Sequence, residues 1–211
     1  MRKLCPTFVA FTLFVGVAMA GGSPHAVAKF QIFGAARLVV GGIPPDDHAV
    51  DLTSNCGPET FNPTCYNDPT FTYSGIAFTP AAPFALSSLT NLSADYNLDG
   101  ADCGGGSPRF TIYLSGGPNV WGYFGLPPNF TGCYHGWLNT GNLTTDPTAR
   151  WFVGNTQYTW ATLEATYGTS LVTEIDIQVD GGWFAVQGQD ATIDNYTVNN
   201  YVMRAALCSR R

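Results

Sequence analysis

The amino-acid sequence predicts an all-β protein, an antiparallel β-sandwich with one short helix. Short runs of β-branched and aromatic residues recur along the chain, each bounded by Gly, Pro, Asn or Asp, as is typical of strands joined by turns. The 211 residues include 24 Gly and 14 Pro, and only 11% of them are charged. The stretch EIDIQVD, residues 174–180, alternates strictly between polar and apolar side chains, which indicates a strand with two different faces.

The N-terminal end of the chain predicts export. Arg2 and Lys3 precede an apolar run that ends in Ala18-Met19-Ala20, the pattern of a secretory signal peptide over residues 1–20. We expect a leader or edge segment over 21–48, a single domain over 49–203 and a basic tail over 204–211. No second long apolar stretch follows, so we expect no membrane span and a secreted or cell-surface location.

Eight segments have strand character, and one has helical character. The expected strands are 70–78, 88–97, 109–114, 120–124, 150–153, 171–179, 183–186 and 192–198. The segment WATLEATY, residues 160–167, has the spacing of a short amphipathic helix, with Thr159 as N-cap and Gly168 as the C-terminal stop.

Charge and cysteine usage narrow the function classes further. The formal net charge of −6 becomes more negative once the signal peptide is removed, and an acidic surface repels phosphate, which argues against a nucleic-acid partner.

The chain has six cysteines, and removal of the signal peptide with Cys5 leaves five in an oxidising compartment. We expect disulfides between Cys56 and Cys65 and between Cys103 and Cys133, with Cys208 unpaired; other pairings stay open.

A metal site is the first candidate functional feature. Asp95, Asn97, Asp99 and Gly100 match the beginning of a helix-loop-helix calcium loop, but Gly106 stands where a bidentate Glu is needed, so this is not that motif. The hypothesis that remains is a structural calcium held by Asp95, Asp99 and Asp102; the alternative is a plain acidic turn. We expect no other cofactor.

Aromatic residues form the second candidate. Flat rings stack on sugar rings, although aromatics also fill β-sheet cores. Among the tryptophans, those next to Gly or Asn in turns are expected to be exposed. The candidate glycan-binding residues are Trp121, Trp137, Trp183 and Tyr123.

Catalytic machinery finds little support in the sequence. His135 is the one histidine inside the expected domain, and no G-x-S-x-G elbow precedes a helix. The stretch Glu174-Ile175-Asp176-Ile177 resembles the catalytic strand of the laminarinase and agarase family of glycosidases. That resemblance implies a carboxylate nucleophile and a second carboxylic acid, but Gln178 or Val179 stands where the acid is expected. The alternative is a polar solvent face on an edge-facing strand.

A second resemblance concerns the whole domain. The strand entry GGGSPRF, the turn DGGW and the final strand TIDNYTVNN resemble secreted bacterial jelly-roll domains of the carbohydrate-binding-module type. The resemblance implies a jelly-roll sandwich that binds polysaccharide, sometimes with structural calcium, and assigns no catalytic residue. We therefore expect a non-catalytic glycan binder. The alternatives are a glycoside hydrolase or polysaccharide lyase using Glu174, Asp176 and Asp180, and a structural cell-surface protein.

Overall fold

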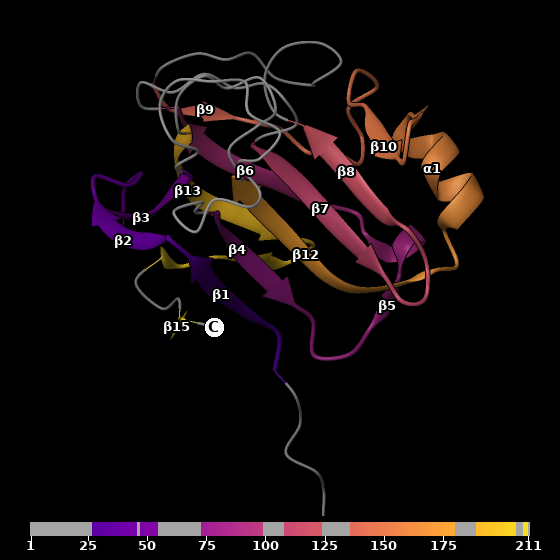
Figure 1. The fold of residues 1–211 in the computed structure, drawn as a ribbon, viewed down its shortest axis with the longest axis horizontal. Coiled ribbons are helices and arrows are strands. Elements are labelled where there is room, and N and C mark those ends of the chain that lie inside the picture. Colours follow the sequence, from indigo (N-terminus) through magenta and orange to yellow (C-terminus); the bar gives the residue numbers. More distant parts are fainter. Residues whose placement is uncertain are drawn as a thin grey trace, which may run out of the picture.

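The computed structural model describes residues 27–45, 47–54, 73–98, 108–123, 136–179 and 189–205, and the backbone of 209–210. These residues form two packed β-sheets with one α-helix beside them, which confirms the all-β sandwich (Figure 1). Among the described strand pairs, all are antiparallel except β1 with β15.

The first sheet contains the strands that face the viewer in Figure 1. Its strands in spatial order are β11 (Thr156–Tyr158), β10 (Trp151–Val153), β8 (Asn119–Tyr123), β7 (Arg109–Leu114), β12 (Leu171–Val179), β4 (Ser74–Thr79), β1 (Lys29–Gly34) and β15 (Ser209–Arg210), and β5 (Phe84–Ala85) also pairs with β12. The alternating segment EIDIQVD therefore lies largely in a central strand, between β7 and β4, and the expectation of an edge-facing strand is wrong.

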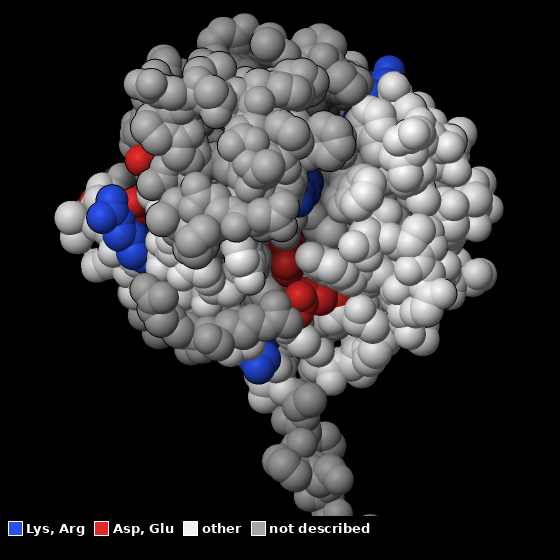
Figure 2. Space-filling view, viewed as in Figure 1, with Lys and Arg blue, Asp and Glu red and all other residues white. Residues whose placement is uncertain are grey.

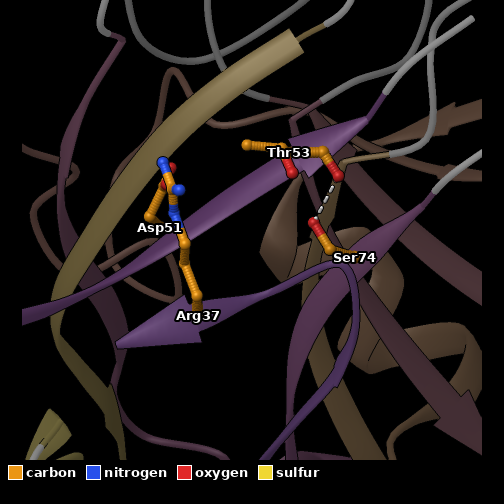
Figure 3. Close-up of polar contacts among 4 residues, drawn as sticks. All are labelled: Arg37, Asp51, Thr53 and Ser74. Atoms are coloured by element: carbon orange, nitrogen blue, oxygen red, sulfur yellow. Dashed lines mark hydrogen bonds and ion pairs between the residues drawn. The ribbon is translucent and has the colours of Figure 1, made fainter. Parts of the chain in front are cut away.

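The second sheet packs behind the first. Its order is β2 (Arg37–Val40), β3 (His48–Ser54), β13 (Gln189–Val198), β6 (Leu92–Asn97) and β9 (Leu138–Asn139), with β14 (Tyr201–Val202) paired to β13. Ser74 Oγ, on β4 of the first sheet, donates a hydrogen bond of 2.7 Å to the Thr53 carbonyl on β3 of the second (Figure 3). Apolar side chains from the facing sides of both sheets fill the space between them.

The core follows the period-two pattern of the strands. Ile175, Ile177 and Val179 on β12 are fully buried on the inner face, as are Ile193 and Tyr196 on β13. The Tyr196 hydroxyl donates to the Ile175 carbonyl at 2.8 Å, so the one polar atom of this ring is satisfied between the sheets. Burial, and secondarily the charges of Asp176 and Glu174, raise the pKa of Tyr196 well above its ordinary value.

The helix α1 (Trp160–Tyr167) has the predicted bounds. Thr159 is the N-cap: its hydroxyl accepts from the Thr162 N–H, and the Thr162 hydroxyl accepts from the Thr159 N–H, which completes a capping box. Trp160 packs edge-on against the buried Trp151 of β10, with ring centroids 5.2 Å apart, and this contact ties the helix to the first sheet.

One strand begins later in the structure than the sequence predicts. The segment expected over 88–97 is a strand only from Leu92, after a 3₁₀ turn (Leu86–Ser88), because the Asn199 side chain accepts the N–H groups of Thr90 and Asn91 instead of a neighbouring strand.

The segment 21–48 contributes one strand to each sheet: β1 pairs with β4, and β2 pairs with β3. β1 has Ile32 in the core, and β2 is an edge strand of the second sheet. None of the described helices is long and apolar enough to cross a membrane.

Candidate functional site

The outer face of the first sheet, the side away from the core, carries four candidate residues predicted from the sequence: Trp121, Tyr123, Glu174 and Asp176. Strand alternation places every second residue of β12, β7, β8 and β10 there. Strand register then aligns them in two rows across the sheet: Phe152–Trp121–Thr111–Asp176 and Tyr123–Arg109–Gln178.

Two carboxylates lie on this face in the middle of the sheet. Glu174 and Asp176 are two residues apart on β12, so their side chains leave the strand on the same side. Figure 2 shows acidic side chains together near the middle of this face, with uncharged surface on the side of β8, β10 and α1. Asp176 is only 2% exposed although it points away from the core, so the expectation of a solvated polar face is wrong at this residue.

Tyr113 connects the two carboxylates. It lies directly opposite Glu174 on the neighbouring strand β7, and its hydroxyl hydrogen-bonds the Asp176 carboxylate. Burial, followed by the charges of Asp176 and Glu174, raises the pKa of Tyr113 to about 12, with Arg109 acting in the opposite direction. Tyr113 therefore keeps its proton at neutral pH, and its hydroxyl donates a hydrogen bond to Asp176.

Arg109 and Gln178 form a cross-strand pair beside the acids. They face each other in the register between β7 and β12. With the amide oxygen of Gln178 turned toward Arg109, it accepts from Nε at 3.1 Å and from the second terminal nitrogen of the guanidinium. The Gln178 side-chain oxygen therefore serves as an acceptor for arginine.

Three aromatic side chains lie at the other end of these rows. Tyr123 and Phe152 pack at 5.2 Å between ring centroids and an interplanar angle of 41°, and Trp121 is directly opposite Phe152. All three are partly exposed. We call Trp121, Tyr123 and Phe152 the aromatic platform. It supplies flat apolar rings next to donors and acceptors on the same sheet.

The sequence-predicted aromatic residues do not share one groove. Trp121 and Tyr123 lie on the outer face of the first sheet, whereas Trp137 immediately precedes β9 of the second sheet and lines a separate pocket there. Trp183 lies outside the described residues, as do His135 and Asp180.

Asp95 of the expected calcium site lies on β6 of the second sheet, where it accepts hydrogen bonds from two asparagine side chains. Its two oxygens accept from Asn139 Nδ2 at 2.7 Å and from Asn195 Nδ2 at 2.8 Å. Asp99 and Asp102 lie outside the described residues. Within the described part of the chain, no three His, Cys, Asp or Glu side chains cluster as metal ligands would.

The proposed disulfides also fall outside the described residues. This applies to Cys56, Cys65, Cys103, Cys133 and Cys208 alike.

Sequence reasoning missed Arg109, Tyr113 and Phe152 as site residues. The signal was present for two of them: RFTIYL alternates, so that Arg109 and Tyr113 share a face. What the sequence did not contain was the identity of the neighbouring strand, which places Tyr113 opposite Glu174.

No protein-family model and no curated protein matches the chain. Among solved structures, the chain is similar to one described as a structural analysis of an exo-beta-agarase, with a TM-score of 0.41 and 13% sequence identity. The match covers 84% of this chain and 24% of that chain.

Proposed function

We propose that the protein is an exported, non-catalytic β-sandwich that binds a polysaccharide on the outer face of its first sheet. The observation that carries this proposal is the aromatic platform beside the Arg109–Gln178 pair. A sugar chain has apolar ring faces and a rim of hydroxyls. The rings of the platform can stack on the apolar faces of the sugar. The guanidinium, amide and carboxylate groups can donate to and accept from its hydroxyls.

The electrostatics of this face favour a neutral glycan. Asp176 and Glu174 lie at its centre; of the described cations on this face, Arg109 lies beside them on β7 and Lys29 lies two strands away on β1. An anionic polysaccharide would meet like charges there, whereas neutral hydroxyl groups can donate to the carboxylates at no such cost.

The test is affinity electrophoresis in gels that contain soluble neutral polysaccharides. Trp121→Ala and Tyr123→Ala each remove one ring of the platform, and we expect each to weaken retardation by about tenfold in affinity, which corresponds to about 1.4 kcal/mol. Tyr201→Ala is the matched control, because Tyr201 is an aromatic residue 44% exposed on β14 of the other sheet. Equal retardation of all four proteins would contradict the proposal.

A glycoside hydrolase is the second candidate, favoured by the placement of Glu174 and Asp176 on one face of β12. Retaining glycosidases need two carboxyl groups about 5–5.5 Å apart, one as nucleophile and one as proton donor. Asp176 already accepts a hydrogen bond from the Tyr113 hydroxyl, and the Gln178 amide has no acidic proton to donate to a leaving group. Release of reducing sugar by the wild type, abolished in Glu174→Gln, would replace the binding proposal with this one.

A further inference from the structure

A separate pocket of about 250 Å³ lies on the outer face of the second sheet. Its polar lining comprises Arg37, Asp51, Asn97, Asp190 and Thr192, and Trp137 supplies an aromatic wall. Drug-sized ligands occupy about 300–1,000 Å³, so this pocket suits a smaller ligand, about the size of one sugar ring with its hydroxyls.

The pocket is built by strand register. Arg37 on β2 pairs with Asp51 on β3, Asp51 with Thr192 on β13, and Thr192 with Asn97 on β6. With adjacent strands about 4.8 Å apart, this row crosses about 14 Å of sheet. A guanidinium, a carboxylate, a hydroxyl and an amide therefore stand side by side on one surface.

The Arg37–Asp51 pair fixes one end of the row (Figure 3). Arg37 Nε donates to Asp51 Oδ2 at 2.6 Å, while the side chains are 66% and 6% exposed, respectively. Asp51 Oδ1 is buried and has no hydrogen-bond partner among the described residues. A buried carboxylate oxygen of this kind is costly unless a donor reaches it.

Trp137 is held at the other end by backbone and side-chain bonds to β6. Asn97 Oδ1 accepts from the Gly136 N–H at 2.8 Å, and Asp95 accepts from Asn139 at 2.7 Å, so both sides of the short segment that carries Trp137 are anchored. Leu138 packs against the core and Trp137 alternates to the outer face. The ring is thus positioned by the fold beside the polar row.

We propose that this pocket binds one neutral sugar unit. Vicinal hydroxyls can donate to Asp51 and accept from Arg37, while the ring face stacks on Trp137. Among the described residues that line it, the pocket has one guanidinium, of Arg37, and two carboxylates, of Asp51 and Asp190, so a carboxylated sugar meets a net negative charge from these residues. This inference is independent of the glycan surface proposed on the first sheet, because it uses different residues on the opposite face of the sandwich.

The experiment is a titration of the isotope-labelled protein with methyl glycosides of neutral hexoses, with methyl galacturonide as the anionic comparison, followed by the indole N–H resonance of Trp137. We expect saturable shifts with at least one neutral glycoside. Trp137→Ala and Arg37→Gln should each weaken binding by about tenfold, measured calorimetrically. Asp51→Asn is left aside, because its buried position risks the fold.

Controls separate binding from folding. Tyr201→Ala and Arg150→Gln change a partly exposed aromatic and a partly exposed arginine outside the pocket lining, and both should bind like the wild type. Circular dichroism melting of Trp137→Ala and Arg37→Gln should show folded proteins. No saturable shift with any neutral glycoside, tighter binding of the galacturonide, or unchanged affinity in both pocket variants would overturn the proposal. These outcomes do not affect the polysaccharide test at Trp121.

Discussion

Asp95 makes the most informative single test of the second sheet, because it distinguishes a structural carboxylate from a calcium ligand. Asp95 lies on β6, between β9 and β13. One of its oxygens accepts from Asn139 on β9, and the other accepts from Asn195 on β13. Asn195 has a φ of 45°, in the left-handed region, where the β13–β6 register shifts. Asp95 therefore stabilises both an irregularity in β13 and the two-residue strand β9.

The magnitude follows from the two bonds that Asp95→Ala removes. A hydrogen bond to a charged group contributes about 1.5–3 kcal/mol, and partial exposure of Asp95 reduces this to about 1 kcal/mol for each bond. We therefore expect a loss of about 2 kcal/mol in the free energy of unfolding. For a domain of 150–250 residues this corresponds to a Tm lower by about 4–8 °C.

The assay is urea and thermal unfolding of wild type, Asp95→Ala and Asp146→Ala, each with calcium and with EDTA. Asp146 is the matched control, because its carboxylate accepts only from the nearby Thr148. In Asp95→Ala, amide exchange should also accelerate at Thr140 and Leu143, whose N–H groups bond to the β6 backbone.

Two results would refute this reasoning about Asp95. One is a change in Tm no larger than that of Asp146→Ala. The other is an EDTA effect on the wild type alone: EDTA lowers the Tm of the wild type as much as the Asp95→Ala substitution lowers it in calcium, and EDTA does not change the Tm of Asp95→Ala. The second result would establish the expected calcium site at Asp95 in place of the purely structural role.

Three further predictions concern stability. Trp151→Ala should cost about 3–5 kcal/mol in urea unfolding, because the buried ring leaves a cavity and Trp160 loses its packing partner. Thr159→Ala should cost about 1 kcal/mol and raise amide exchange in the first turn of α1, whereas Thr166→Ala, in the last turn, should not. The Tyr113 pKa is about 12 in the fold against an ordinary value of 10.0, so its stabilisation is complete below pH 10 and lost as pH rises toward 12. Partial exposure limits this loss to about 1 kcal/mol, and Tyr113→Phe should show a shallower decline of stability over that range; identical slopes would contradict the assignment.

The sequence was sufficient where the determinants are local. The bounds of α1 follow from the Thr159 cap and the spacing of WATLEATY, and the alternation of EIDIQVD fixes which β12 residues share a face. The sequence was insufficient to predict whether the polar face of β12 is exposed to solvent or covered. Burial of Asp176 depends on β12 being a central strand beside Tyr113, and the order of strands in a sheet is a long-range property that period-two alternation does not contain.

Strand order also explains why Trp121 and Trp137, which have similar neighbours in the sequence, lie on different sheets. Trp121 and Trp137 both stand next to Gly or Asn-rich turns, which correctly excludes them from the core cluster. Trp121 belongs to β8, paired with β7 and β10, whereas Trp137 is anchored through Asn97 to β6 of the other sheet. The register of β2, β3, β13 and β6 then places Arg37, Asp51 and Thr192 in the row that ends beside Trp137, although Arg37 and Thr192 are 155 positions apart in the chain. Each tryptophan therefore has its own set of neighbours, and substituting one should leave the ligand of the other bound.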